Sequence, residues 1–242
     1  MMRTRTGGLL AELHAHTTWS DGALSMGALV DLYGARGFDV LCITDHACRA
    51  DGPWRELSPR GITASNHAAY LTELDREAAR ALERYGLLVV PGLELTYNDP
   101  DPAQAAHALA LGLRSFVSVD DGIDGAIETA VLAGAALVAA HPYDDEEAPS
   151  AGRLTQRFAR DAELSARVHR FELFNRTQLF AWVARAGMPC VASGDFHRLA
   201  HLGGWKSLIP CARDEEAVIR HLRSRRPVFL TQVDAGLERA AA

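Results

Sequence analysis

The sequence lacks three features that would assign it to familiar classes of protein. No apolar run approaches the ~18 residues of a membrane-spanning helix, and the start of the chain has no apolar stretch long enough for a signal peptide. The four cysteines form no Cys-x-x-Cys pair, so we expect reduced thiols in a cytoplasmic protein. The basic residues form no block and the net charge is −6, which argues against stable binding to duplex nucleic acid.

What the sequence does contain is a regular alternation of β-rich runs and helical segments. Its 242 residues, 48% of them apolar, predict one domain spanning residues 1–242. The predicted strands are 9–16, 38–46, 87–96, 105–113, 135–142, 168–175, 188–197 and a short 227–231. The predicted helices are 24–37, 65–86, 123–134, 152–166, 176–187 and 213–226. Repeated strand–helix units with seven main strands favour an α/β fold, a distorted TIM-like (β/α)7 barrel, over an open doubly wound sheet.

Two histidines lie close to the start of the chain, in "ELHAHTTWSDG". His14 and His16 are two positions apart in a predicted strand, so their imidazoles point to the same face. Ten histidines in 242 residues give roughly 0.4 such pairs by chance. The pair alone is therefore weak evidence for a metal site.

The other predicted strands strengthen that evidence, because nearly every one carries a metal-ligand residue near its C-terminal end. These residues are His46, Glu94, His107, His141, Asp195 and His197. In a barrel the carboxyl ends of the strands meet at one rim. Imidazoles and carboxylates pooled there predict bound divalent cations, and mixed nitrogen and oxygen ligands suit Zn, Mn or Fe better than Mg or Ca.

Taken in order, "HAHTTWSDG", "ITDH", "GLELT", the histidine in "AAHAL", "HP", "ELFN" and "SGDFH" resemble the PHP domain family, named for polymerase and histidinol phosphatase. The resemblance implies a distorted (β/α)7 barrel, two or three metal ions and phosphoester hydrolysis. It implies a trinuclear site with these ligands: His14, His16, Glu94 and Asp195 for a first ion, Glu94, His107 and His141 for a second, and Asp21, His46 and His197 for a third. Many members read Gly-Ser-Asp-x-His where this chain has "SGDFH", with the ligand spacing unchanged.

The resemblance and the chemistry of metal pairs together suggest catalytic roles for three residues. Two ions ~3.5–4 Å apart can share a water, lower its pKa and aim it at phosphorus. Glu94 would bridge them, and Asp195 would both bind metal and orient the nucleophile. His197 or a metal-bound water would protonate the leaving group.

Arginines near the predicted rim are candidates for binding the substrate's phosphate. Arg176 and Arg198 each follow a predicted strand. Arg49 lies in the long connection 47–65, whose length is typical of a lid or binding loop. Asp45 and Glu172 each admit two interpretations, support of a metal ligand or an ordinary structural polar group.

The sequence thus predicts a metal-dependent phosphoesterase that acts on a small phosphomonoester or nucleotide. Histidinol phosphate, nucleoside mono- or bisphosphates and the 5′ end of short oligonucleotides (a 5′–3′ exonuclease) all stay open as substrates, and "GDFH" favours the nucleotide branch. A non-hydrolytic, metal-binding regulatory module would be expected to lack some ligands, and none is missing. An amidohydrolase-type enzyme typically uses a lysine at a strand end, whereas Glu94 matches the bridging position here. The oligomeric state stays open.

Overall fold

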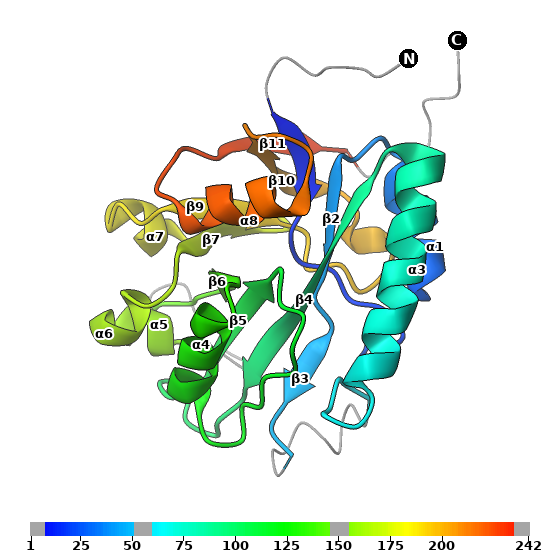
Figure 1. The fold of residues 1–242 in the computed structure, drawn as a ribbon. Coiled ribbons are helices and arrows are strands. Elements are labelled where there is room, and N and C mark those ends of the chain that lie inside the picture. The colour runs from blue at the N-terminus through cyan, green and yellow to red at the C-terminus, as the bar shows by residue number, and fades with distance from the viewer. Residues whose placement is uncertain (1–7, 51–59, 146–154, 235–242) are drawn as a thin grey trace.

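The computed structural model describes residues 8–50, 60–145 and 155–234. Figure 1 shows a strongly curled sheet with helices around its outside. The strands are β1 (Leu9–Glu12), β2 (Val40–Ile43), β3 (His46–Cys48), β4 (Leu88–Tyr97), β5 (Ala106–Leu111), β6 (Ala136–Ala140), β7 (Arg170–Asn175), β8 (Gln178–Leu179), β9 (Cys190–Ser193), β10 (Gly204–Ile209) and β11 (Phe229–Val233). The α-helices are α1 (Met26–Ala35), α3 (His67–Tyr85), α4 (Ile123–Leu132), α5 (Arg157–Arg160), α6 (Ala162–Ser165), α7 (Ala181–Arg185) and α8 (Glu215–Arg223).

The sheet is mixed rather than parallel throughout. Its order is β11-β10-β1-β2-β4-β5-β6-β7-β8, with β3 paired to β4 and β9 to β7. The pairs β1–β2, β2–β4, β6–β7 and β7–β9 are parallel, as the sequence predicts. β5 runs antiparallel to both β4 and β6, and β10 runs antiparallel to β1. The curled α/β sheet is therefore confirmed, whereas a succession of seven β/α units is not.

The differences from the predicted elements have local causes. No helix joins β4 to β5, so these strands form an antiparallel hairpin. β10 was not predicted, since its segment "GWKSLI" begins at the second of two glycines and carries a lysine that turns out to be buried. The predicted helix 152–166 is broken at Asp161, whose side chain caps α6 by accepting the amide of Leu164. The predicted helix 176–187 begins only at Ala181, because β8 forms a hairpin with β7 first.

One predicted connection lies partly outside the described residues. In the connection 47–65 the stretch 51–59 is not described, so its expected role as a lid is not addressed. None of the helices in the described ranges combines the length and apolarity that a bilayer crossing requires.

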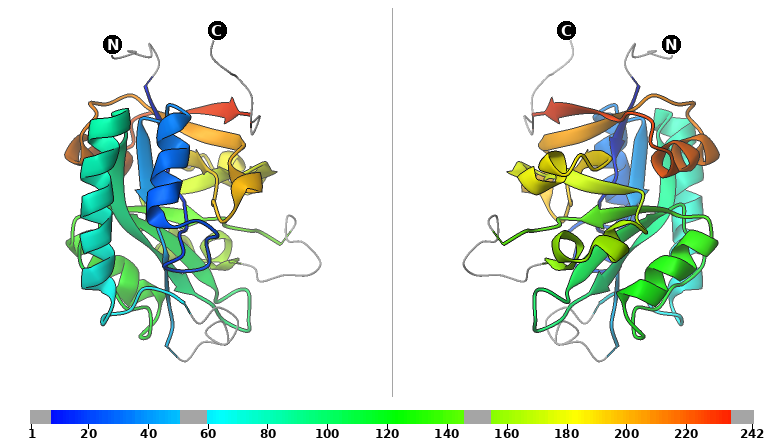
Figure 2. Two further views of the ribbon diagram at one scale, coloured as in Figure 1. Left: turned by 90° about the vertical axis from the view of Figure 1, so that its right-hand side faces the viewer. Right: turned by 90° about the vertical axis from the view of Figure 1, so that its left-hand side faces the viewer.

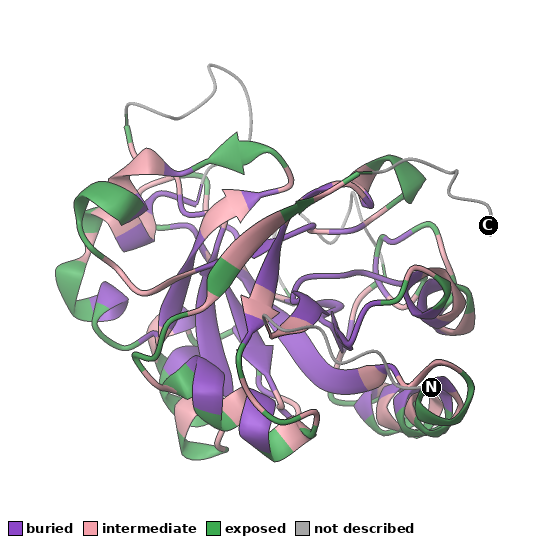
Figure 3. Cartoon of the chain, turned by 90° about the horizontal axis from the view of Figure 1, so that it is seen from above, coloured by how far each residue is buried: buried purple, intermediate pink, exposed green. Residues whose placement is uncertain are grey.

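The core forms on both faces of the sheet because strand residues alternate. On β2, Leu41 and Ile43 join the large apolar cluster that also receives α1 and α3, which lie side by side in Figure 2. Val40 and Cys42 join a smaller cluster together with side chains of α8. Figure 3 shows the central strands as mostly buried, with the helices around them buried in part and exposed in part. Both faces of the central strands are thus fixed, which holds the strand ends in register.

Candidate metal centre

The nine residues predicted as metal ligands form one network of close contacts around Glu94. This side chain lies in β4 and is fully buried. Its two carboxylate oxygens lie 2.9–3.4 Å from ring nitrogens of five histidines, which are His14, His16, His46, His107 and His141. Residues far apart in the sequence therefore converge on one carboxylate at the ends of the strands.

We call His14, His16, Glu94 and Asp195 the inner cluster. The Nε2 atoms of His14 and His16 lie 3.3 and 3.4 Å from Glu94 Oε2, and each lies 3.4 Å from Asp195 Oδ1. A cation about 2.0–2.1 Å from four tetrahedral ligands would hold neighbouring ligands about 3.3–3.4 Å apart. The distances from His14 and His16 to each carboxylate therefore match ligand spacing, and His14, His16 and Asp195 lie close enough together to share one ion, while Glu94 groups with His14 and His141.

Unpaired polar atoms at the same place support this fit. The buried atoms His14 Nε2, His16 Nε2 and Glu94 Oε2 have no hydrogen-bond partner. His46 Nδ1 lies 2.9 Å from Glu94 Oε2, but at an angle unsuitable for a hydrogen bond. Buried polar atoms without a partner are costly, and a bound cation would remove that cost.

The histidine rings are held so that one nitrogen of each faces the carboxylates. The Nδ1 atoms of four histidines lie within hydrogen-bonding distance of an oxygen: His14 with Glu172 (2.9 Å), His46 with Thr96 (2.7 Å), His141 with Thr155 (3.2 Å) and His197 with the carbonyl of Asp195 (3.0 Å). Their Nε2 atoms face Glu94 or Asp21. His107 is reversed, with Nε2 3.0 Å from Asn98 Oδ1 and Nδ1 facing Glu94. Such tethering fixes the tautomer and aims the free nitrogen at a metal.

Glu172 is one of the residues that the sequence left undecided. It is buried, lies beside His14 Nδ1, and accepts hydrogen bonds from the amide of His141 (2.6 Å), from Asn175 Nδ2 (2.9 Å) and from the hydroxyl of Ser193. The structure therefore shows that Glu172 supports His14 and His141, two of the histidines that face Glu94.

Backbone strain is concentrated at this site. Among the described residues, the non-glycine positions with positive φ are His141 (31°), Arg176 (56°) and Asp195 (42°). Such conformations cost of order 1–3 kcal/mol each and persist where surrounding contacts impose them. At Asp195 those contacts include Arg176, which donates to the carbonyl of Asp195 (2.9 Å) and to its Oδ2 (2.8 Å).

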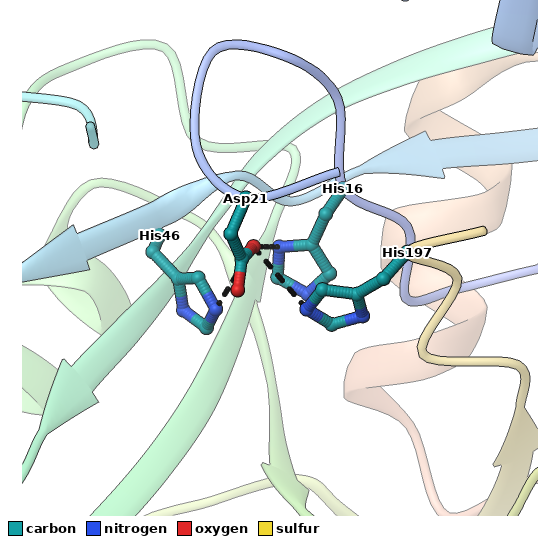
Figure 4. Close-up of side chains that lie close together, drawn as sticks. All are labelled: His16, Asp21, His46 and His197. Atoms are coloured by element: carbon teal, nitrogen blue, oxygen red, sulfur yellow. Dashed lines mark ion pairs between the residues drawn. The ribbon is translucent and has the colours of Figure 1, made fainter. Parts of the chain in front are cut away.

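The outer cluster consists of Asp21, His46 and His197, and Figure 4 shows the two rings and His16 gathered around the Asp21 carboxylate. Asp21 Oδ1 lies 3.2 Å from His197 Nε2, 3.5 Å from His46 Nε2 and 3.8 Å from His16 Nδ1. This set, and the sets His14–His16–Asp195 and His14–Glu94–His141, could each hold a metal ion. His16 was predicted for the first ion alone, yet its other nitrogen faces the outer cluster.

Asp45 shapes the turn that carries Asp21. Its carboxylate accepts the amide and hydroxyl of Thr17 (both 2.8 Å) and the amide and hydroxyl of Ser20 (3.1 and 2.6 Å). The sequence left Asp45 between two roles, and the structure combines them. It caps a turn, and that turn brings Asp21 to His46 and His197.

Burial and neighbouring charges together set the protonation states of the centre. Burial alone would raise the pKa of Glu94, but the imidazoles of His46 and His14 more than offset burial and hold its pKa well below the usual value. Burial and the neighbouring charges of His46 and His197 lower the pKa of His16 to about 3. A carboxylate that stays charged and an imidazole that stays neutral are the forms that bind metal.

The three predicted phosphate-binding arginines occupy different positions. Arg176 contacts Asp195 and borders a cleft of about 450 Å³ whose lining includes His141, Tyr143, Asn175, Gln178 and Asp195. Arg198 is exposed and donates to His201 (3.1 Å). Arg49 lies over the ring of Tyr97 and 3.9 Å from Asp99 Oδ2. Of the three, Arg176 is the one with a contact to a residue of the inner cluster among those described.

Comparison with known proteins places the chain in a family. It is 26% identical over 247 aligned residues to the DNA polymerase/3′-5′ exonuclease PolX of Bacillus subtilis, covering 96% of this chain and 42% of the relative. It is 26% identical over 133 residues to the phosphoribosyl 1,2-cyclic phosphate 1,2-diphosphodiesterase of Eggerthella lenta, covering 55% of this chain and 38% of the relative. The chain thus spans less than half the length of these curated relatives.

A similar fold occurs in a crystal structure of a two-domain protein from Bacteroides vulgatus that contains a predicted PHP-like metal-dependent phosphoesterase. The TM-score is 0.67 at 18% identity, over 96% of this chain and 69% of that one. The family model of the PHP domain matches residues 12–144, which include His14 to His141 of the centre. The chain therefore belongs to the PHP domain family.

Proposed function

We propose that this protein is a metal-dependent phosphoesterase that acts in the cytoplasm on a small phosphomonoester or nucleotide. The observation that carries the proposal is the inner cluster, where buried nitrogen and oxygen atoms without partners stand at ligand spacing. We also propose that the curled sheet is a distorted relative of a (β/α)7 barrel and that the nine residues of the centre bind two or three Mn, Zn or Fe ions.

Within this proposal Glu94 and Asp195 have different roles. Bound divalent ions would supply a water that is nucleophilic near neutral pH and would neutralise phosphate charge. Glu94 presents one oxygen to His14 and His16 and the other to His107 and His141, as a bridging ligand would. Asp195 turns Oδ1 to the inner cluster while Arg176 holds Oδ2, which fixes the carboxylate to orient the nucleophile.

His197 is our candidate proton donor to the leaving group. Its side chain is about a fifth exposed and its Nδ1 is held by the carbonyl of Asp195. The neighbouring cleft of about 450 Å³ is of a size for a small substrate, and it places Arg176 beside Asp195, where a guanidinium would meet phosphate oxygens. Histidinol phosphate and the 5′ end of short oligonucleotides remain alternative substrates.

Two other function classes fit the molecule less well. The chain contains a single lysine, Lys206, and it is buried with Nζ 2.8 Å from Glu12 Oε2. No lysine is therefore available for the bridging role typical of amidohydrolase barrels. A non-hydrolytic regulatory module gives no reason to keep His197 partly exposed next to Asp195, which lines the cleft.

Metal analysis combined with a substrate panel tests the proposal. Purified protein in Mn²⁺ would be assayed on p-nitrophenyl phosphate, histidinol phosphate, nucleoside mono- and bisphosphates and a short 5′-phosphorylated oligonucleotide. We expect bound metal, phosphate release from at least one member of the panel, and loss of both on chelation. Full activity after complete chelation, or in Asp195→Asn, would show that the proposed chemistry is wrong.

A further inference from the structure

A second group of buried charges lies next to the inner cluster. Lys206 in β10 and Glu12 in β1 are both fully buried, with Nζ 2.8 Å from Oε2. The β1–β10 register pairs Ala11 with Ser207, so the next position sets Glu12 opposite Lys206. The Nζ geometry does not meet hydrogen-bond criteria, so the attraction is that of an ion pair. Removing two charges from water is costly, so a gain in stability alone does not explain why both charges are buried here.

The remaining contacts of Glu12 give that reason. Its Oε1 accepts the amides of Leu13 (3.0 Å), His14 (3.2 Å) and Gly194 (2.7 Å), and its Oε2 accepts the hydroxyl of Tyr33 (3.0 Å). His14 belongs to the inner cluster, and Gly194 immediately precedes Asp195, which also belongs to it. One carboxylate oxygen therefore binds the backbone at both of the chain segments that supply the inner cluster's His14 and Asp195.

The hydrogen bonds of Glu12 join two segments that have little backbone pairing with each other. β1 pairs with β2 and β10, and β9 pairs with β7. Between the two segments that follow β1 and β9, the described pairing is one isolated bridge, Ala15 with Phe196. Without Glu12, the positions of His14 and Asp195 would depend on that bridge, on the hydrogen bond from the amide of Ala23 to the carbonyl of His197 (2.7 Å) and on side-chain contacts.

Gly194 shows how closely the ion pair approaches the turn. A Cβ atom at this position would lie 2.3 Å from both Glu12 Oε2 and Lys206 Nζ. The order Ser193-Gly194 suits this arrangement, because Ser193 donates to Glu172 while Gly194 leaves space for the buried pair.

We propose that Glu12, fixed by Lys206, is a positioning residue that ties the Asp195 turn to the segment after β1 that carries His14 and so sets the ligand spacing of the inner cluster. The proposal rests on the proposed function, in that it takes this cluster to bind metal. Glu12 acts through the backbone and touches neither metal nor substrate.

Two double variants separate this role from the stability of the ion pair. Removing one partner alone would leave a buried unpaired charge, so both variants remove both charges. Glu12→Gln/Lys206→Met keeps an acceptor oxygen for the amides of His14 and Gly194. Glu12→Met/Lys206→Met has none. We expect the second to bind Mn²⁺ about 10- to 100-fold more weakly than the first, measured by titration of metal-free protein well below each unfolding midpoint.

A control at the other end of β1 tests for a general effect of weakened packing. Asp39 accepts the amide of Leu10 (2.9 Å) and pairs with Arg213. Asp39→Asn should lower the unfolding midpoint and leave Mn²⁺ affinity unchanged. Equal Mn²⁺ affinity of the two double variants, or an equal loss in Asp39→Asn, would overturn the positioning role.

Two further provisions keep the test decisive. Glu12→Asp replaces the Glu12→Met/Lys206→Met variant if that variant does not fold. It keeps the charge, but its shorter side chain withdraws the carboxylate oxygen from the amide of Gly194. Weakened Mn²⁺ binding is again expected. Mn²⁺ binding is measured without substrate, so a wild-type protein that binds Mn²⁺ but hydrolyses nothing would contradict the proposed function while leaving this comparison intact.

Discussion

The inner and outer clusters of the centre are built in different ways. The side chains of His14, His16 and Glu94 are fully buried, and that of Asp195 is 13% exposed. In the outer cluster Asp21 is 26% and His197 22% exposed. Glu94 lies within a ten-residue strand, whereas Asp21 lies in a turn held by Asp45. The inner cluster is thus part of the core, whereas the outer cluster combines a buried strand residue, His46 in β3, with the more exposed Asp21 on its turn.

This difference suggests a division of roles. Ligands fixed within the core are preorganised and resist rearrangement. A partly exposed ligand on a turn, such as Asp21, can respond to a substrate or release an ion at little cost to the fold. The following predictions test whether the two clusters behave as separate units.

The largest effect is expected at the centre of the inner cluster. Glu94→Gln should lower phosphoesterase activity by about 10³-fold, because the neutral amide loses the charge that faces five imidazoles. Activity and bound metal would be measured together. Glu83→Gln, on the exposed side of α3, is the matched control and should behave as wild type. Retention of most activity in Glu94→Gln would contradict the central place given to the inner cluster.

A smaller effect is expected at residues that contact the predicted metal ligands without being ligands themselves. Glu172→Gln leaves His14 without its carboxylate partner and should weaken metal binding about 10- to 100-fold. Titration of metal-free protein would measure this. Asp45→Asn, which loosens only the turn that carries Asp21, should weaken one site and spare the rest. If both variants lose the same ions, the two clusters are not separate.

Asp21→Asn tests the outer cluster directly. Because Asp21 contacts His46 and His197 but not Glu94, we expect the protein to lose one equivalent of metal and retain the others. Activity should fall only about tenfold, since the inner cluster keeps its ligands. Metal content by elemental analysis is the measurement. Loss of all bound metal would show that the centre assembles as a single unit.

The titration of the histidines offers a finer comparison in metal-free protein. Burial acts to lower the pKa of His46 and His197, but in both cases nearby carboxylates, including Asp21, more than offset it and raise the pKa. A raised pKa contributes stability that is fully present below the unfolded-state value of about 6.5 and is lost as pH rises through the folded-state value. His16, whose pKa is lowered to about 3, has the opposite effect: below about pH 6.5 it makes the folded state less stable as the pH falls.

We therefore expect the metal-free protein to lose stability, by about 1 kcal/mol, as pH rises above about 6.5. Urea unfolding across that range would show it. The slope should be shallower in Asp21→Asn, because Asp21 helps to raise both pKa values. An unchanged slope in that variant would mean that His46 and His197 do not titrate through the outer cluster.

The same division explains how much could be predicted from the sequence. The inner residues end or lie within β-rich runs, and strand alternation places His14 and His16 on one face, so their convergence could be anticipated. Asp21 was anticipated only through the family resemblance. The turn that brings its side chain to His46 and His197 is held by Asp45, which lies 24 positions further along the chain.

The features that could not be predicted from the sequence are chiefly the strands and charged residues that support the predicted ligands. β10 was missed because a buried lysine is rare in a strand, and its partner Glu12 becomes evident only once the β1–β10 register is known. The reversal of β5 likewise depends on pairing with β4 and β6, and its own residues would suit a parallel strand equally well.

The smallest effect is expected at an arginine beside the outer cluster. Arg198 is exposed and its described side-chain contact is to His201, so Arg198→Ala should change kcat/KM by less than about twofold. Arg176→Ala is the matched variant on the inner side. Because Arg176 holds both the carbonyl and Oδ2 of Asp195, its loss should lower kcat and not only raise KM. Steady-state kinetics on the best substrate of the panel would separate the two parameters. If Arg198→Ala proved the more damaging, phosphate would be bound from the outer side, and the cleft beside Asp195 would not be the entrance to the centre.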